Sequence, residues 1–243
     1  MATGRAPTVV VDGQVVRRIP IRTHHLTGAD DIVQVAERYG RAQAQAGDVL
    51  VVSETAVAVT QGRAIPEDQI RVGLLARLLW RFVHKSPHGV GLRRPSSMQC
   101  AINECGAWRI VLAAVIGSAG KMIGRRGDFY RVAGIQAATI DAAQTSPMQP
   151  DCVILGPLEP ERVAADIAAR LGCRAAVMDC NDIGGSWALG ASQGLDRAWI
   201  EAAMAGNPLG QKDEQTPMAI VRVEGPARPS PDSVSNADGS MGQ

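Results

Sequence analysis

Short apolar runs that alternate with amphipathic segments constrain the fold of this chain more than any other feature. The run Cys152–Leu155 is followed by Arg162–Leu171, where apolar residues recur at helical spacing, and then by the run Ala175–Met178. A strand, helix, strand order favours a right-handed unit with two parallel strands. The sequence therefore predicts an α/β protein, and scarce aromatic residues, at 3% of the chain, favour that class over a β-sandwich.

Length and charge limit the classes of partner. The 243 residues, 46% of them hydrophobic, can bury one core, or one core and a small lobe. The net charge of +1 provides no overall field for nucleic acid or anionic lipid, so we expect neither partner. The longest apolar run, Ile110–Ile116, is far shorter than the roughly 20 residues that span a bilayer. Five cysteines without a Cys-x-x-Cys pair favour a reducing cytoplasm.

The clearest candidate site follows the run Ala175–Met178. Asp179, Asn181 and Asp182 come directly after it, and two glycines follow. Carboxylate and amide oxygens suit a hard cation such as Mg²⁺ or Mn²⁺, which often bridges to phosphate. An Asx-rich turn, in which these side chains cap their own backbone, is the alternative interpretation.

A second polar group follows the apolar run Val49–Val52. Ser53, Glu54 and Thr55 come next, at the position where open α/β sheets bind ligands. Arg22 and Arg63 could supply positive charge for a phosphate there. Alternatively, Ser53 is simply the cap of the helix that follows.

Two further segments could serve a ligand. Asp141 follows the apolar run Ala137–Ile140 and is another acidic residue at the end of such a run. The segment Gly117–Lys121 is rich in glycine but lacks the spacing of a phosphate-binding loop. The segment Lys121–Asp128, with Arg125 and Arg126, is instead predicted to be a basic loop hinged on glycines that either binds an anion or is solvated. Phe129–Gly134 is predicted as a strand after it.

Several segments resemble a known family. Gly47–Glu54, followed by Gln61-Gly62-Arg63, resembles the first signature of the coenzyme F420-0:L-glutamate ligases, the gamma-glutamyl ligases of the deazaflavin pathway. Ile19–Ile21 is similar to their nucleotide-contacting segment, and Asp179-Cys180-Asn181 to their Asp-Thr-Asn metal motif. The likeness extends to about Val223, so we expect one domain over residues 1–224 and a disordered tail, rich in Pro, Ser, Asp and Gly, over 225–243.

The resemblance implies a GTP-dependent ligase with Mg²⁺ or Mn²⁺, a mixed sheet with helices packed on it, and a homodimer. In that chemistry the γ-phosphate moves to a substrate carboxylate, and the amine of L-glutamate attacks the acyl phosphate. The expected metal ligands are Asp141, Asp179, Cys180 in the place of a threonine, and Asp182, which could take over that role. The expected nucleotide-binding residues are Ile19, Pro20, Ile21, Arg22, Ser53, Glu54, Thr55, Asn181 and Gln211. The expected residues for an anionic substrate are Arg63, Lys121, Arg125 and Arg126.

A second hypothesis is a non-catalytic protein that binds nucleotide and metal on the same scaffold. The replacement of the family's threonine by Cys180 motivates it. A Rossmann dehydrogenase is disfavoured because no Gly-x-Gly-x-x-Gly opens a helix.

Overall fold

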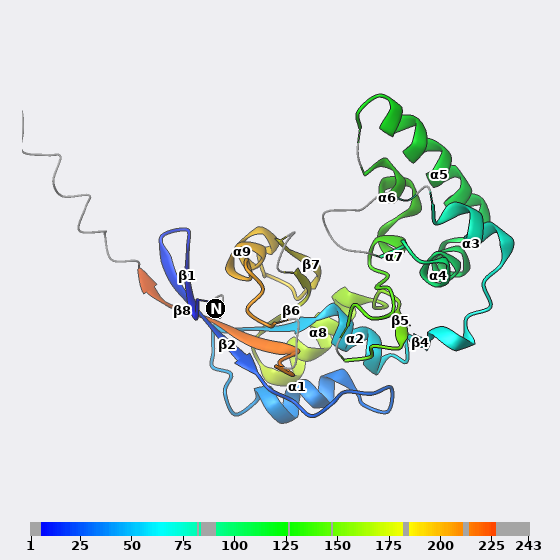
Figure 1. Ribbon diagram of the computed structural model, residues 1–243. Coiled ribbons are helices and arrows are strands. Elements are labelled where there is room, and N and C mark those ends of the chain that lie inside the picture. Colours follow the sequence, from blue (N-terminus) through cyan, green and yellow to red (C-terminus); the bar gives the residue numbers. More distant parts are fainter. Residues whose placement is uncertain are drawn as a thin grey trace, which may run out of the picture.

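The computed structural model describes residues 6–81, 83, 91–125, 127–146, 148–181, 185–210 and 214–226. Within these residues, a mixed six-stranded sheet carries helices on both faces, and a separate helical lobe lies beyond one end of it (Figure 1). The expected class, α/β with a mixed sheet and helices packed on it, is confirmed. The strands of the large sheet are β1 Thr8–Val11, β2 Gln14–Ile21, β3 Val49–Ser53, β6 Arg174–Asn181, β7 Gly185–Ala191 and β8 Met218–Pro226.

The strand order is β1-β2-β8-β3-β6-β7. The pair β3 and β6 is parallel, and the other neighbouring pairs are antiparallel. Asp12 and Gly13 connect β1 to β2 with φ angles of 48° and 72°, which are typical of a tight hairpin turn. The sheet thus contains one parallel pair in its interior, flanked on both sides by antiparallel strands.

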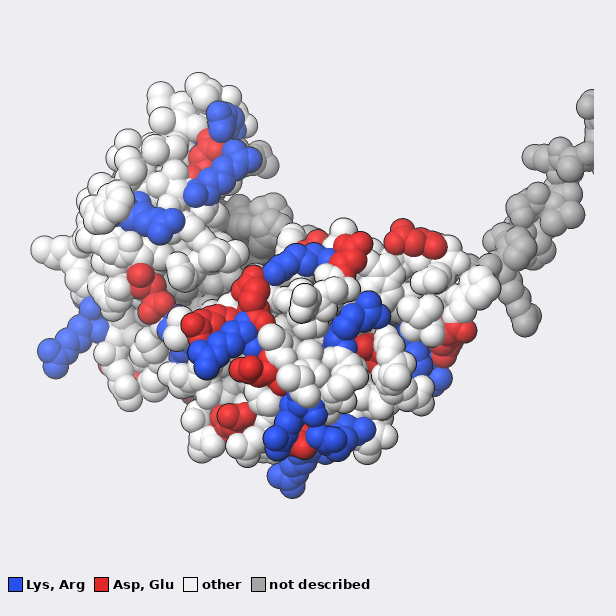
Figure 2. Space-filling model, turned by 180° about the vertical axis from the view of Figure 1, so that it is seen from behind, with Lys and Arg blue, Asp and Glu red and all other residues white. Residues whose placement is uncertain are grey.

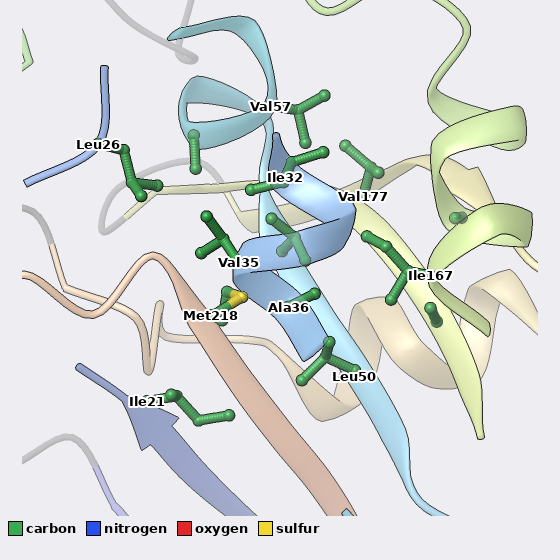
Figure 3. Packing of buried hydrophobic residues seen from close by; sticks show 14 of the residues in the cluster. Ile21, Leu26, Ile32, Val35, Ala36, Leu50, Val57, Ile167, Val177 and Met218 are labelled. Carbon is green, nitrogen blue, oxygen red and sulfur yellow. The ribbon is translucent and has the colours of Figure 1, made fainter. Parts of the chain in front are cut away.

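The central strands are apolar throughout because both faces of the sheet are covered. Leu50 and Val52 of β3 face a core formed with α1 Ile32–Gly40, α2 Glu54–Thr60 and α8 Pro160–Leu171. Figure 3 shows part of this packing, with Ala36 of α1 beside Leu50 and Ile32 at the other end of the helix, near Val57. Val49 and Val51 face the opposite core, formed with α9 Arg197–Ala203.

The helical lobe has its own hydrophobic core. It contains η1 Glu67–Gln69, α3 Leu74–Leu79, α4 Pro95–Cys105, α5 Ala107–Met122, α6 Asp128–Ala133 and α7 Ile135–Ala138. A short antiparallel ribbon, β4 Ala64–Pro66 with β5 Cys152–Ile154, joins the lobe to the rest of the molecule. Among the described residues no single helix has the length and apolarity to cross a membrane; only α4 and α5 together pass that test, and they are bent by 117°.

One prediction for the lobe was wrong. The segment Phe129–Gly134 belongs to α6 and its C-cap and not to a strand. The physical reason is helix packing: a Cβ atom on Gly117 would lie 3.2 Å from the Cα atom of Phe129, so the glycine lets α6 approach α5. Phe129 and Ala133, one turn apart, are the buried side of α6. The predicted loop Lys121–Asp128 agrees with the connection between α5, which ends at Met122, and α6, which begins at Asp128.

The predicted unit of two parallel strands around α8 was also wrong. β5 pairs with β4 in the small ribbon, whereas the parallel neighbour of β6 is β3. The order strand, helix, strand along the chain is as predicted, but the sequence does not specify which strands pair. β8 extends to Pro226, two residues beyond the expected domain boundary. The expected tail from residue 227 onward lies outside the described residues.

Candidate functional site

One edge of the large sheet gathers several of the predicted site residues. Ser53 of β3 lies opposite Met178 of β6 in the parallel register, so the next residues, Glu54 and Asp179, follow at the same level. Glu54 begins α2, whereas Asp179 is still within β6, opposite Trp187 of β7. Asp179 is therefore a strand residue and not part of a turn, whereas residues 182–184 of the proposed Asx-rich turn lie outside the described residues.

Asp141 reaches the site from the lobe. Its backbone exchanges two hydrogen bonds with Ile154, the Asp141 amide donating at 2.8 Å and the Ile154 amide at 3.0 Å. Ile154 also pairs with Ala64 in the ribbon, close behind the end of α2. The position of Asp141 thus depends on the connection between the lobe and the sheet.

The three carboxyl groups interact electrostatically. Burial raises the pKa of Glu54 well above its usual value, and the charges of Asp179 and Asp141 raise it further. Burial also raises the pKa of Asp141, to about 7, with Asp179 as the second cause. Among the described residues no hydrogen-bond donor meets the buried Oε2 atom of Glu54. The surroundings of Glu54 and Asp141 therefore favour the neutral form of both carboxyl groups.

Cys180 lies beside this cluster and packs partly against the core under α9. Burial is the largest cause that raises the pKa of its thiol, to about 12; a hydrogen bond with Ser186 lowers it, and the charges of Asp179 and Glu54 raise it. Ser186 in turn donates to the Met204 carbonyl at 2.8 Å. Cys180 is consequently a neutral thiol in the protein without metal.

The carboxyl cluster fits a hard cation by its chemistry. In the part of the chain that the structure describes, no three His, Cys, Asp or Glu side chains already have the spacing of a metal centre. However, the charges of Asp179 and Asp141 raise the pKa of Glu54, and the buried Oε2 atom of Glu54 has no hydrogen-bond partner among the described residues. A cation would relieve both conditions. Asp182, the other expected ligand, lies outside the described residues, and so does Gln211.

The predicted nucleotide-binding segment at the end of β2 lies at the same edge of the sheet. Ile21 pairs with Met218, and Met218 also pairs with Val52, so β2 ends next to β8 and β3. Ile21 is buried in the core, Ile19 is half-buried, and Pro20 and Arg22 are exposed. Arg22 is thus the accessible positive charge of this segment.

Ser53 caps a helix, which is the alternative role that the sequence suggested for it. Its Oγ atom accepts a hydrogen bond from the Ala56 amide at 3.3 Å as the N-cap of α2, and Thr55 is half-buried in the first turn. The Ser53 amide donates to Pro217 at 2.8 Å, which returns the loop before β8 to this edge. The backbone of Asn181 ends β6 here, and its side chain lies outside the described atoms.

The predicted basic residues do not lie together. The Arg63 Nε atom donates to the Gly156 carbonyl at 2.6 Å, and its Nη2 atom pairs with Glu104 at 2.5 Å. Lys121 lies in the last turn of α5, at the end that projects farthest from the sheet in Figure 1, and Arg125 follows that helix and pairs with Asp128 at 3.2 Å. Arg126 lies outside the described residues. Of the three described members of this set, only Arg63 lies in the connection between the sheet and the lobe, where its carbonyl accepts from the Leu155 amide at 3.0 Å.

Two features of the structure were not predicted. Ser186 meets Cys180 only because β6 and β7 form a hairpin, whose register the sequence does not indicate. Asn207 is fully buried in the loop before β8, and its side-chain amide has no hydrogen-bond partner within the described residues. The Gly and Pro residues on either side of it signalled a turn, but not burial.

The arrangement of a mixed sheet with carboxyl groups at one edge agrees with the comparison to known families. The model of the F420-0:Gamma-glutamyl ligase family matches residues 20–194, which include Glu54, Asp141, Asp179 and Cys180. The chain belongs to this family, and the match supports a gamma-glutamyl ligase function in F420 biosynthesis. No curated protein matches the chain.

Proposed function

We propose that the protein is an amide ligase that depends on a nucleotide and a divalent metal. It joins L-glutamate to a small carboxylate acceptor like coenzyme F420-0, with GTP as co-substrate and an acyl phosphate as intermediate. The observation that carries this proposal is the cluster of buried Glu54 with half-buried Asp141 and Asp179 at the sheet edge. Family membership supplies the class of reaction.

Asp141 and Asp179 would hold the metal, Mg²⁺ or Mn²⁺, together with Glu54. Cys180 and Asp182 remain in the proposal as additional ligands. A cation bound there neutralises charge on the phosphoryl group during its transfer. The side chains themselves would fix the cation between β3 and β6, where the strand register determines the separation of Glu54 and Asp179.

The nucleotide would lie along the ends of β2 and β3. Exposed Arg22 would pair with a phosphate oxygen, and the segments Ile19–Ile21 and Ser53–Thr55 would line the site. Asn181 and Gln211 complete this proposed set. For the acceptor, Arg63 is the proposed basic residue in the connection between the sheet and the lobe, with Lys121, Arg125 and Arg126 as further proposed contacts. We also propose that the enzyme is a cytoplasmic homodimer without nucleic-acid or membrane partners.

A second candidate is a non-catalytic protein that binds nucleotide and metal. The neutral thiol of Cys180 favours it, because this residue stands where the resemblance places a threonine hydroxyl. Both candidates require binding, but only the ligase releases GDP and phosphate when acceptor and glutamate are present.

The two candidates are separated by assaying the full chain with GTP, Mn²⁺, coenzyme F420-0 and L-glutamate. We expect GDP release that depends on the acceptor, and a product heavier by one or more glutamyl groups in mass spectrometry. Asp179→Asn should lower turnover by at least about 100-fold. The matched control Asp166→Asn, on the exposed side of α8, should keep full activity. Metal-dependent GTP binding without GDP release would instead support the binding protein.

A further inference from the structure

Arg18 of β2 is a buried arginine. On the face seen in Figure 2, basic side chains lie at the surface and most of them adjoin acidic ones. Arg18 is only 6% exposed, and among the described residues no carboxylate forms an ion pair with it. It lies two residues after buried Val16 of the same strand, so both side chains face the core under α9. A guanidinium buried without a counter-ion costs free energy, which indicates a specific role.

The hydrogen bonds of Arg18 go to backbone carbonyls, two of them at the end of α9. Its Nη1 atom donates to the Ala205 carbonyl at 2.6 Å and to the Ala203 carbonyl at 3.5 Å. Its Nη2 atom donates to the Ala6 carbonyl, on the segment before β1. The last carbonyls of a helix lack partners within the helix and carry the negative end of its dipole, so a cation suits this position. Arg18 thus holds the end of α9 against β2.

Ser186 of β7 binds the carbonyl between those two. Its hydroxyl, in a residue that is 8% exposed, donates to the Met204 carbonyl at 2.8 Å. The three consecutive carbonyls of residues 203–205 are therefore bound by two buried side chains from strands in opposite halves of the sheet. α9 has only seven residues, so few intrahelical hydrogen bonds hold its end without these anchors.

The chain reverses directly after the anchored carbonyls. Gly206 and Asn207 have φ angles of 77° and 46°, and Asn207 is fully buried. The left-handed conformation costs free energy for a residue with a side chain, so the surrounding structure must hold this turn in place. Farther along, the Thr216 hydroxyl donates to the Leu209 carbonyl. The course of the segment 206–217 therefore starts from a fixed point, the end of α9.

The same segment returns to the edge of the sheet where the nucleotide site is proposed. The Thr23 amide donates to the Gln215 carbonyl at 3.0 Å, and the Ser53 amide donates to the Pro217 carbonyl at 2.8 Å. Ser53 is the last residue of β3, and Thr23 follows Arg22 just beyond the end of β2. The position of the segment 206–217 thus determines the surroundings of both strand ends.

We propose that Arg18 and Ser186 are positioning residues for the nucleotide site, because they hold the end of α9 and thereby fix the segment 206–217 against the ends of β2 and β3. The inference rests on the proposed function, which places the nucleotide at these strand ends. Both side chains act through backbone carbonyls and not by touching the nucleotide. Without either anchor the segment populates other conformations, and the apparent affinity for nucleotide falls with the fraction of competent molecules.

The test combines hydrogen exchange, followed by mass spectrometry, with calorimetric titration of GDP in saturating Mn²⁺, on the full chain. Arg18→Met and Ser186→Ala each remove one anchor. Amides of the segment 206–217 should exchange at least about tenfold faster in both variants, and the Kd for GDP should rise at least about tenfold. In turnover, KM for GTP should rise while kcat stays within about threefold of wild type.

Two further variants serve as rescue and control. Ser186→Thr keeps the hydroxyl donor and should restore wild-type exchange and GDP affinity. Arg17→Met, at the neighbouring position on the opposite face of β2 with a side chain that is 54% exposed, is the matched control and should behave as wild type. Circular dichroism and thermal melting establish that each variant is folded.

Wild-type exchange rates over 206–217 in folded Arg18→Met and Ser186→Ala would overturn the proposal. Faster exchange with unchanged GDP affinity would equally overturn it, because the segment would then not serve the nucleotide. A wild type that binds no GDP would refute the proposed function and, with it, the nucleotide role of the segment, whereas the exchange rates would still show whether Arg18 and Ser186 hold the segment in place.

Discussion

Glu54 and Asp179 stand at the same level of two neighbouring parallel strands, one residue beyond the opposed pair Ser53 and Met178. One carboxyl group thus begins a helix while the other remains in a strand, and the charge of Asp179 raises the pKa of Glu54. Asp141 joins them from the lobe through its bridge to Ile154. The candidate site is therefore shared between the parallel pair β3–β6 and the lobe.

The carboxyl cluster predicts how stability depends on pH without metal. Asp141 titrates near pH 3.8 when unfolded but has a pKa of about 7 in the folded protein, so the folded state binds the proton more tightly. The stabilising contribution is complete below about pH 4 and is lost as the pH rises through 7. Urea unfolding in EDTA should show a loss of up to about 1.4 kcal/mol per pH unit from this group.

The variant Asp141→Asn should flatten this pH dependence, because it removes the titrating group that burial perturbs. Asp166→Asn, exposed on α8, should leave the profile unchanged. Saturating Mn²⁺ should also restore the stability that the wild type has lost above pH 7. If the free energy of unfolding of the wild type instead rises between pH 4 and pH 7, and rises with the same slope in Asp141→Asn, then the cluster does not control the pH dependence of stability.

Substitution of Cys180 tests whether this residue binds the metal. If its sulfur is a ligand, Cys180→Thr should tighten Mn²⁺ binding by about tenfold and weaken Cd²⁺ binding by at least as much, since Mn²⁺ prefers oxygen and Cd²⁺ prefers sulfur. Calorimetric titration of each metal gives both constants. Unchanged affinities for both metals would remove Cys180 from the ligand set.

The glycines of α5 predict a packing effect in the lobe. Gly117→Ala gains about 1 kcal/mol of helix propensity but forces the Phe129 backbone, 3.2 Å from the new Cβ atom, to move. We expect a net loss of about 1–2 kcal/mol in the free energy of unfolding. Ser118→Ala, the neighbouring control, should change stability by less than about 0.5 kcal/mol. A stabilised Gly117→Ala variant would contradict the close approach of α5 and α6.

Substitution of Arg63 tests whether this residue stabilises the fold or binds the substrate. Its guanidinium is 12% exposed and bonds to Gly156 and Glu104, so Arg63→Ala should destabilise the protein by about 2–4 kcal/mol. Chemical denaturation measures this change, with exposed Arg71→Ala as the control. An Arg63→Ala protein of unaltered stability but with a raised KM for the acceptor would show that substrate binding is its main role.

The sequence was most informative where a local pattern decides the structure. The hairpin at Asp12-Gly13, the strand Val49–Val52 and the helix ending at Gly172 all follow from short-range signals, and the structure has each of them. The acidic residues at Glu54, Asp141 and Asp179 were identifiable because each follows an apolar run. Their proximity was not, because it depends on the β3–β6 register and on the bridge to Ile154.

The errors have a common cause in long-range packing. Phe129-Tyr130-Arg131-Val132 has the composition of a strand, but its burial against Gly117 makes it helical. Likewise β5 is apolar enough for a central strand, yet it pairs with β4 in the ribbon. In both cases the local propensity was real, and a contact distant in sequence overrode it.

Calorimetric titration of Mn²⁺ in the presence of GDP tests the central proposal most directly, because it measures the carboxyl cluster without requiring the correct acceptor. Wild type and Asp166→Asn should bind Mn²⁺ with the same affinity, whereas Glu54→Gln, Asp141→Asn and Asp179→Asn should each weaken binding at least about tenfold while remaining folded. Equal Mn²⁺ affinity in all five proteins would contradict a metal site formed by Glu54, Asp141 and Asp179.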